Sequence, residues 1–209
     1  HGFAWETPRH LPSTGGYFID KTEVTNQKYA EFVQATGHAP PPHWKNQTFP
    51  KGEGNLPVVN VSLQDARAYA GWAGKRLPTE AEWEKAARGV GGNLYPWGDV
   101  FDMGFCHHMR EKETGPIAVG SRKSGASPYG CLDMIGNVLE WTTSWFQGYE
   151  NSKATNPQYG NEFKVLRGGA WYKLELAPIP TRCASRFPAK MDEKKLSIGF
   201  RCVKDIEEE

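Results

Sequence analysis

The sequence predicts a single α+β domain over residues 1–209 in which regular secondary structure takes up little of the chain. Three helix patterns precede residue 90, and most of the short strand patterns follow it. Glycine, proline and tryptophan are abundant, with 23, 15 and 8 residues, and this composition is typical of long loops packed by large aromatic rings. No repeat or low-complexity linker divides the chain, so we expect one domain with a small antiparallel sheet.

The three helix patterns are marked by capping residues and by apolar side chains at helical spacing. They cover residues 25–37, 62–73 and 79–88, and each begins with Thr or Ser as a candidate N-cap and ends at or beside a glycine. In the second and third patterns, Asp65 and Glu82 stand three positions after the cap, as a capping box requires. We therefore expect three short helices in the first half of the chain.

The strand patterns are short and are separated by turn residues, above all glycine, proline and serine. They are recognised by their content of β-branched and aromatic side chains. The expected strands are Tyr17–Asp20, Val138–Phe146, Lys164–Gly168, Thr181–Arg186 and Gly199–Val203.

The charge balance argues against a nucleic-acid partner, and the hydropathy argues against a membrane-spanning segment. The 25 Lys and Arg residues nearly balance the 24 Asp and Glu residues, which gives a net charge of +1 with no run of like charge. Proteins that bind nucleic acid through its phosphates carry a basic surface, so no nucleic-acid partner is expected. The apolar runs are far shorter than the ~20 residues that cross a bilayer, and the mean hydropathy is -0.63, so no membrane-spanning segment is expected.

Six separated motifs indicate a family. They are Asp20-Lys-Thr-Glu-Val-Thr-Asn26, Gly74-Lys-Arg-Leu-Pro-Thr-Glu-Ala-Glu-Trp83, Tyr95-Pro-Trp-Gly98, Asp133-Met-Ile-Gly-Asn-Val-Leu-Glu-Trp141, Leu166-Arg-Gly-Gly169 and Ile198-Gly-Phe-Arg-Cys202. In their order and spacing, from about Tyr17 to Val203, the chain resembles the formylglycine-generating enzyme (sulfatase-modifying factor) family. The resemblance implies a variant of the C-type lectin fold with little regular secondary structure. The opening strand of that fold would precede His1, so we expect a chain processed or excised from a longer polypeptide.

The resemblance also implies where the chemistry of the family would lie. Family enzymes bind copper(I) through a pair of active-site cysteines, because soft thiolates suit this cation. Here the two positions are Lys173 and Pro178, and neither side chain binds copper(I). A serine and a tryptophan of the same pocket correspond to Ala170 and Leu139. Neither copper binding nor formylglycine generation is therefore expected.

The resemblance implies a calcium site whose ligand types are all retained. It assigns the side chains of Asp133 and Glu140 and the main-chain carbonyls of Gly136 and Val138. Calcium takes about six to eight oxygen ligands, and two buried carboxylates that converge without a cation repel each other. Calcium is therefore the expected cofactor, and the alternative is that both acids face water in turns. A second family calcium site, which would match residues 105–117, is not expected because its asparagine and aspartate are missing.

The cysteines outside this pocket have a structural interpretation. The resemblance matches Cys183 and Cys202 to cysteines that form disulfides in animal relatives, but the partner positions here are Ala70 and Ala87. We therefore expect buried thiols, which behave as small hydrophobic side chains. The other two cysteines carry no spacing signal for a disulfide or a metal.

Histidines and arginines are also interpreted structurally. We expect His107 and His108 to be a solvent-exposed pair that cannot chelate one ion together, because successive side chains of an extended chain point to opposite faces. His38 and His43 are expected in loops. Four arginines near the C-terminal strands are expected to pair with carboxylates such as Glu80 or Glu82: Arg167, Arg182, Arg186 and Arg201.

The leading functional hypothesis is a non-catalytic or divergent family member. It would be a calcium-stabilised scaffold that binds a protein, a peptide or other domains of its own precursor, since loops on a rigid frame change side chains without disturbing the fold. The variable loop between Arg167 and Gly199 is one candidate surface. The other is a groove that would be lined by Leu139, Ala170, Tyr172, Lys173, Glu175 and Pro178.

Two alternatives stay open. One is an oxidoreductase of the non-haem-iron or siderophore-maturation branch of the same family, in which iron would be the cofactor. The other is an accessory module of a larger enzyme. A calcium cofactor favours a bacterial periplasmic or extracellular location, because calcium at resting cytosolic levels would rarely fill a modest site.

Overall fold

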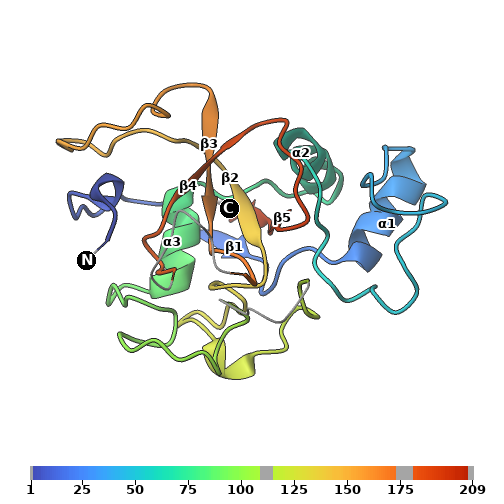
Figure 1. The fold of residues 1–209 in the computed structure, drawn as a ribbon, viewed down its shortest axis with the longest axis horizontal. Helices are drawn as coiled ribbons and strands as arrows, with labels where there is room; N and C mark the ends of the chain where they lie inside the picture. The colour runs from blue at the N-terminus through green and yellow to red at the C-terminus, as the bar shows by residue number, and fades with distance from the viewer. Residues whose placement is uncertain (1, 109–114, 173–180, 207–209) are drawn as a thin grey trace.

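The computed structural model describes residues 2–108, 115–172 and 181–206, and within them short elements alternate with long loops (Figure 1). The helices are α1 (Asn26–Thr36), α2 (Leu63–Trp72) and α3 (Glu80–Arg88). The strands are β1 (Tyr17–Ile19), β2 (Leu139–Trp145), β3 (Phe163–Arg167), β4 (Phe187–Lys190), β5 (Ile198–Gly199) and β6 (Val203–Asp205). No helix of the described residues is long and apolar enough to cross a membrane.

The strands form two small sheets. The larger has the order β4-β3-β2-β5, in which β2–β3 and β3–β4 are antiparallel and β2–β5 is parallel. The smaller pairs β1 with β6 in antiparallel orientation. Figure 1 shows α3 on one side of β2 and β3, with α2 and α1 on the other. The expectation of a small antiparallel sheet therefore holds except at β5.

The three helices confirm the prediction from capping residues. The side chain of Thr25 accepts a hydrogen bond from the backbone N–H of Lys28, and Gly37 ends α1 in the left-handed conformation at φ 71°. Ser62 and Thr79 begin α2 and α3, and in each case both hydrogen bonds of the capping box are formed. Such caps satisfy backbone donors that have no partner within the helix.

Two of the strand predictions were wrong in position. The segment Thr181–Arg186 is not a strand, because Ser185 closes a turn: its N–H donates to the carbonyl of Arg182, and its hydroxyl accepts from the N–H of Arg182. The strand begins only at Phe187. The predicted strand Gly199–Val203 is divided between β5 and β6, since the residues between them bond instead to the segment that follows β1.

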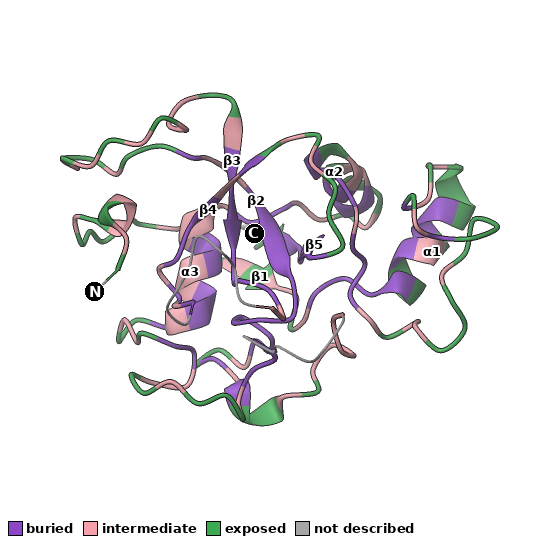
Figure 2. Cartoon of the chain, viewed as in Figure 1, coloured by how far each residue is buried: buried purple, intermediate pink, exposed green. Residues whose placement is uncertain are grey.

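The core consists of two apolar clusters. Figure 2 shows buried residues along the strands of the larger sheet and in all three helices. The larger cluster packs α1 and α2 against the sheet and contains the aromatic rings of Tyr29, Phe32, Tyr69 and Phe200. The smaller lies behind α3 and includes Trp83, Met134, Cys131 and Cys183.

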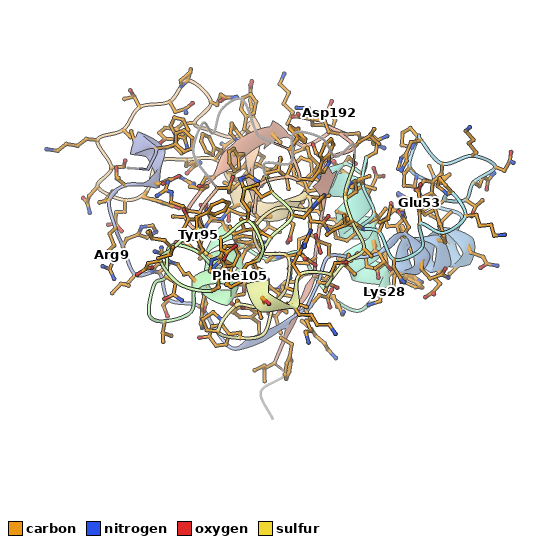
Figure 3. The ribbon with its side chains drawn as sticks, turned by 60° about the horizontal axis from the view of Figure 1, so that its bottom comes forward. Arg9, Lys28, Glu53, Tyr95, Phe105 and Asp192 are labelled. Carbon is orange, nitrogen blue, oxygen red and sulfur yellow. The ribbon has the colours of Figure 1, made fainter. Side chains whose placement is uncertain are left out.

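Stacked aromatic rings also hold the loops, as the composition predicted. The ring of Trp97 contacts those of Tyr95 and Phe105, with centroids 5.6 Å from each. Figure 3 labels Tyr95 and Phe105 in this part of the chain. A loop with few backbone hydrogen bonds thereby gains apolar contacts that fix its course.

Asp65 combines a helix cap with ion pairs to a loop histidine and a distant lysine. Burial alone would raise its pKa, but hydrogen bonds from Lys194, Ser62 and His38 lower the pKa to about 2. A carboxylate with a depressed folded-state pKa stabilises the fold above its unfolded pKa of about 3.9, and this contribution is lost as the pH falls through the folded pKa.

We expect D65N to lower the free energy of unfolding at pH 6 by about 1 kcal/mol and to flatten its decline between about pH 4 and pH 2. Urea titrations across this range measure both effects. The exposed Asp192 offers a control, D192N, that should match the wild type. An unchanged acid limb in D65N would contradict the assignment.

Candidate functional site

The predicted calcium segment, residues 133–140, forms a tight turn that needs glycine at one position. Asp133, Gly136 and Asn137 all have positive φ, at 59°, 89° and 55°. A Cβ on Gly136 would stand 2.4 Å from the carbonyl oxygen of His107, so no other residue fits there without displacement of the backbone. The N–H of Asn137 donates to that same carbonyl at 2.8 Å.

Glu140 and Arg201 form a fully buried ion pair behind this turn. Nε of Arg201 donates to Oε2 of Glu140 at 2.7 Å and Nη2 to Oε1 at 2.8 Å, while the indole N–H of Trp83 donates to Oε2 at 2.8 Å. Burial would lower the pKa of Arg201, but Glu140 raises it above its usual value. The guanidinium of Arg201 is therefore charged.

Glu23 is a second buried carboxylate, and the sequence analysis did not assign it a role. Its Oε1 accepts from Nδ2 of Asn137 at 2.9 Å, whereas its Oε2 is buried and has no hydrogen-bond partner in the described structure. Burial, then the nearby charge of Asp133, raises the pKa of Glu23 well above its usual range, and Glu140 adds to this while Arg201 opposes it. The site thus contains three carboxyl groups, those of Glu23, Asp133 and Glu140, and one guanidinium, that of Arg201.

This surplus of negative charge fits a bound cation. In the described residues, the carbonyl oxygens of Gly136 and Val138 accept no hydrogen bond. No group of three or more His, Cys, Asp and Glu side chains is arranged there to hold a metal ion, so a cation at this turn would depend on carbonyl oxygens as well as carboxylates. Oxygen ligands of this kind suit calcium.

The histidine pair is buried, which corrects the expectation of exposure: His107 and His108 are each only 1% exposed. The N–H of Thr181 donates to Nε2 of His108 at 3.1 Å. Nδ1 of His108 lies 2.7 Å from the carbonyl oxygen of Ala170 and donates to it, since this oxygen can only accept. His108 is therefore neutral and joins the two ends of the 173–180 segment. The sequence shows only two adjacent histidines, and this pattern does not indicate that residues distant in the sequence bury them.

The groove residues are only partly described. Leu139 and Ala170 are buried in the larger core cluster, and Tyr172 is half-buried with its hydroxyl 3.2 Å from that of Ser197. The other three predicted groove residues, Lys173, Glu175 and Pro178, lie outside the described residues. The structure thus describes three of the six predicted groove residues, and two of these three are buried in the core.

The arginines pair with carboxylates, as expected. Arg186 forms a bidentate pair with Glu80 at 2.7 and 2.8 Å. Glu82 is held by Arg76 rather than by an arginine of the C-terminal strands. The remaining pairs are Arg167 with Glu84, Arg182 with Glu6, and Arg201 with Glu140.

All four cysteines are buried, which confirms the prediction for Cys183 and Cys202. Burial raises the pKa of the Cys183 thiol to about 12 and raises that of Cys202 still further. The pKa of Cys131 is raised by the same cause. Burial thus favours the protonated form of these three thiols.

The loop-rich chain, its small mixed sheet and the glycine turn at Gly136 define the formylglycine-generating-enzyme variant of the C-type lectin fold. Residues 3–206 match the sulfatase-modifying factor enzyme 1-like domain. The chain therefore belongs to the formylglycine-generating enzyme (sulfatase-modifying factor) family, as its motifs indicated.

Two relatives and one solved structure show the range of the similarity. The formylglycine-generating enzyme of Streptomyces coelicolor is 34% identical over 97% of this chain and 82% of its own length. The serine/threonine-protein kinase Pkn1 of Chlamydia trachomatis is 33% identical over 96% of this chain, which spans only 35% of the kinase. The structure of PvdO from Pseudomonas aeruginosa superposes with a TM-score of 0.72 at 24% identity, covering 91% of this chain and 80% of PvdO.

The buried pair at Glu140 predicts a large cost when one partner is removed. We expect R201M to lower the free energy of unfolding by about 3–5 kcal/mol, because Glu140 then remains buried without its counter-charge. The double variant E140Q/R201M should recover at least half of this loss. Urea unfolding in EDTA measures all three proteins.

The exposed pair of Lys195 and Glu193 supplies the control. K195M should cost no more than about 1 kcal/mol. Equal losses in R201M and in the double variant would show that shape, and not charge compensation, determines stability at this position.

Proposed function

We propose that this chain is a non-catalytic, calcium-stabilised member of its family whose fold serves as a scaffold for binding a protein or peptide. One observation carries the proposal: the positions of the copper-binding cysteines are Lys173 and Pro178, and all four cysteines of the chain are buried at other positions. Copper(I) chemistry of the family type needs two thiolates that reach one ion. Lysine and proline cannot replace them.

The base of the pocket supports the same conclusion. Ala170 stands where family enzymes have a serine, and Leu139 where they have a tryptophan, and both side chains are buried in the apolar core. Polar groups that would contact a substrate are thus replaced by hydrocarbon. The pocket would therefore lack both the metal ligands and the serine and tryptophan of the family enzymes.

Calcium is supported by the electrostatics of the 133–140 turn. Glu140 is compensated by Arg201, but the unpartnered oxygen of Glu23 and the nearby carboxylate of Asp133 are not. A divalent cation held by Asp133, Glu140 and the carbonyls of Gly136 and Val138 would lower the repulsion among these acids. Its role would be to stabilise the turn that joins the loops to β2.

The segment between β3 and β4 offers the surface for binding. Its two ends are fixed by the buried imidazole of His108, which bonds Ala170 on one side and Thr181 on the other. Arg167 adds a third anchor, since its Nη1 donates to the carbonyl of Ser185 at 2.7 Å. Side chains between such anchors can change while the frame stays constant.

The match to Pkn1 supports a role as a module. In that kinase the similar region is about a third of the whole length. Other domains of a longer precursor are therefore one class of partner that we propose for this chain.

Calcium should raise the melting temperature. At a calcium concentration of about 100 times Kd the folded state gains about 2.7 kcal/mol, which for a domain of this size corresponds to about 5–10 °C. Differential scanning calorimetry in calcium and in EDTA measures the shift, and titration calorimetry gives the stoichiometry. D133A should lose the response, whereas D192A, at an exposed aspartate, should keep it. Identical melting in EDTA and calcium would exclude the site.

The chain should not convert the cysteine of a sulfatase-derived peptide to formylglycine. Mass spectrometry of that peptide after incubation with copper and oxygen measures the product, and the Streptomyces coelicolor enzyme serves as the positive control. Turnover by this chain would refute a non-catalytic role. Stoichiometric iron or copper in the isolated protein would favour an oxidoreductase instead.

A further inference from the structure

Strand β1 uses only one of its two edges. The N–H of Asp20 donates to the carbonyl of Cys202 at 2.9 Å. Because hydrogen-bonded pairs alternate along an antiparallel ladder, the next bonded pair is Phe18 with Lys204. The backbone groups of Tyr17 and Ile19 must therefore point away from β6, and no described residue supplies a backbone partner for the N–H of either.

The backbone of Val203 confirms this alternation from the other side. Val203 faces Ile19 in the register, yet its N–H and carbonyl bond to Arg76, at 2.8 and 2.9 Å, on the far edge of β6. The small sheet is thus covered at its β6 edge and open at its β1 edge.

The open edge borders a cavity of about 520 Å³, which we name the β1 groove. Its walls come from β1, from α3 through Lys85 and Ala86, and from the loop Tyr129–Cys131. The full lining is Gly15, Gly16, Tyr17, Phe18, Ile19, Lys21, Lys85, Ala86, Tyr129, Gly130, Cys131 and Ile206. No described residue of this lining belongs to the 133–140 turn or to the segment between β3 and β4.

The chemistry of the β1 groove is apolar with a basic rim. Phe18, Tyr129 and Ile206 are 67%, 53% and 50% exposed, although large apolar side chains are usually buried. The described lining includes Lys21 and Lys85 but no carboxylate. Nζ of Lys85 lies 5.5 Å from the centroid of the Tyr17 ring, at the mouth of the groove.

We propose that the β1 groove binds an extended segment of a partner protein, with alternating apolar and acidic residues, which adds to β1 as a third strand. The backbone groups of Tyr17 and Ile19 would pair with the segment, because main-chain hydrogen bonds give affinity in strand addition. The apolar lining would receive every second side chain, since these share one face of a strand. The lysines would contact its carboxylates. The inference goes beyond the proposed function and does not depend on it.

The test uses the ¹⁵N-labelled chain in calcium and the synthetic peptides EVEVEVE and EYEYEYE. We expect chemical-shift changes at the amides of Tyr17 and Ile19, slower hydrogen exchange there, and weaker binding at high salt. A peptide N-methylated on the amides of one edge should bind at least tenfold more weakly, because it cannot complete the ladder. The basic peptide KVKVKVK should also bind at least tenfold more weakly.

Charge reversal on the protein supplies the second arm. K21E should weaken EVEVEVE binding at least tenfold, and K153E, at an exposed lysine outside the groove, should leave binding unchanged. The proposal is overturned if neither acidic peptide binds, if the N-methylated peptide binds equally well, or if the shift changes map elsewhere. Binding should persist in a D133A variant that remains folded, which separates this result from the calcium test.

Discussion

The buried ion pair between Arg201 and Glu140 joins several separate parts of this structure. Glu140 is the second residue of the inner strand β2, and its carboxylate also accepts a hydrogen bond from the indole N–H of Trp83 in α3. Arg201 extends the same connection to the carbonyls of Asp20, Lys21 and Leu132. One guanidinium therefore positions the exit of β1, the entry to the 133–140 turn and the sheet. A chain with so little regular structure depends on such polar links, because a buried carbonyl outside a helix or sheet still needs a donor.

Glu23 is a further buried carboxylate near this pair. Among the described contacts, Arg201 forms two hydrogen bonds with Glu140 and none with Glu23. Burial, then the charge of Asp133, raises the pKa of Glu23, and Arg201 opposes this only in part. A proton on Glu23 or a cation at the turn would relieve the repulsion between these carboxylates. At neutral pH a divalent ion relieves more of the repulsion than one proton does, because it compensates two charges.

Local rules predicted the local parts of this fold. The caps at Thr25, Ser62 and Thr79 depend on residues within three positions, so the sequence was sufficient to locate the helices. The failure at Thr181–Arg186 has a local cause, because Ser185 closes a turn with Arg182 that the strand pattern did not indicate. The burial of His108 depends instead on contacts with the remote residues Ala170 and Thr181, which periodicity does not report. Glu23 stood within a recognised motif, but its role became visible only when the fold brought it to Asn137.

The positions that distinguish this chain from copper-binding relatives form two pairs. Lys173 and Pro178 lie in the sequence between Ala170 and Thr181, the two residues that His108 joins. Ala170 and Leu139, in contrast, are part of the core, and apolar side chains there exclude water and replace groups that would otherwise need hydrogen-bond partners. Such replacements favour stability, because a reactive pocket would contain strained residues or buried polar groups without hydrogen-bond partners. Both pairs of positions thus differ from the copper-binding relatives in the same direction, because polarisable or polar side chains are replaced by ones that do not bind copper(I).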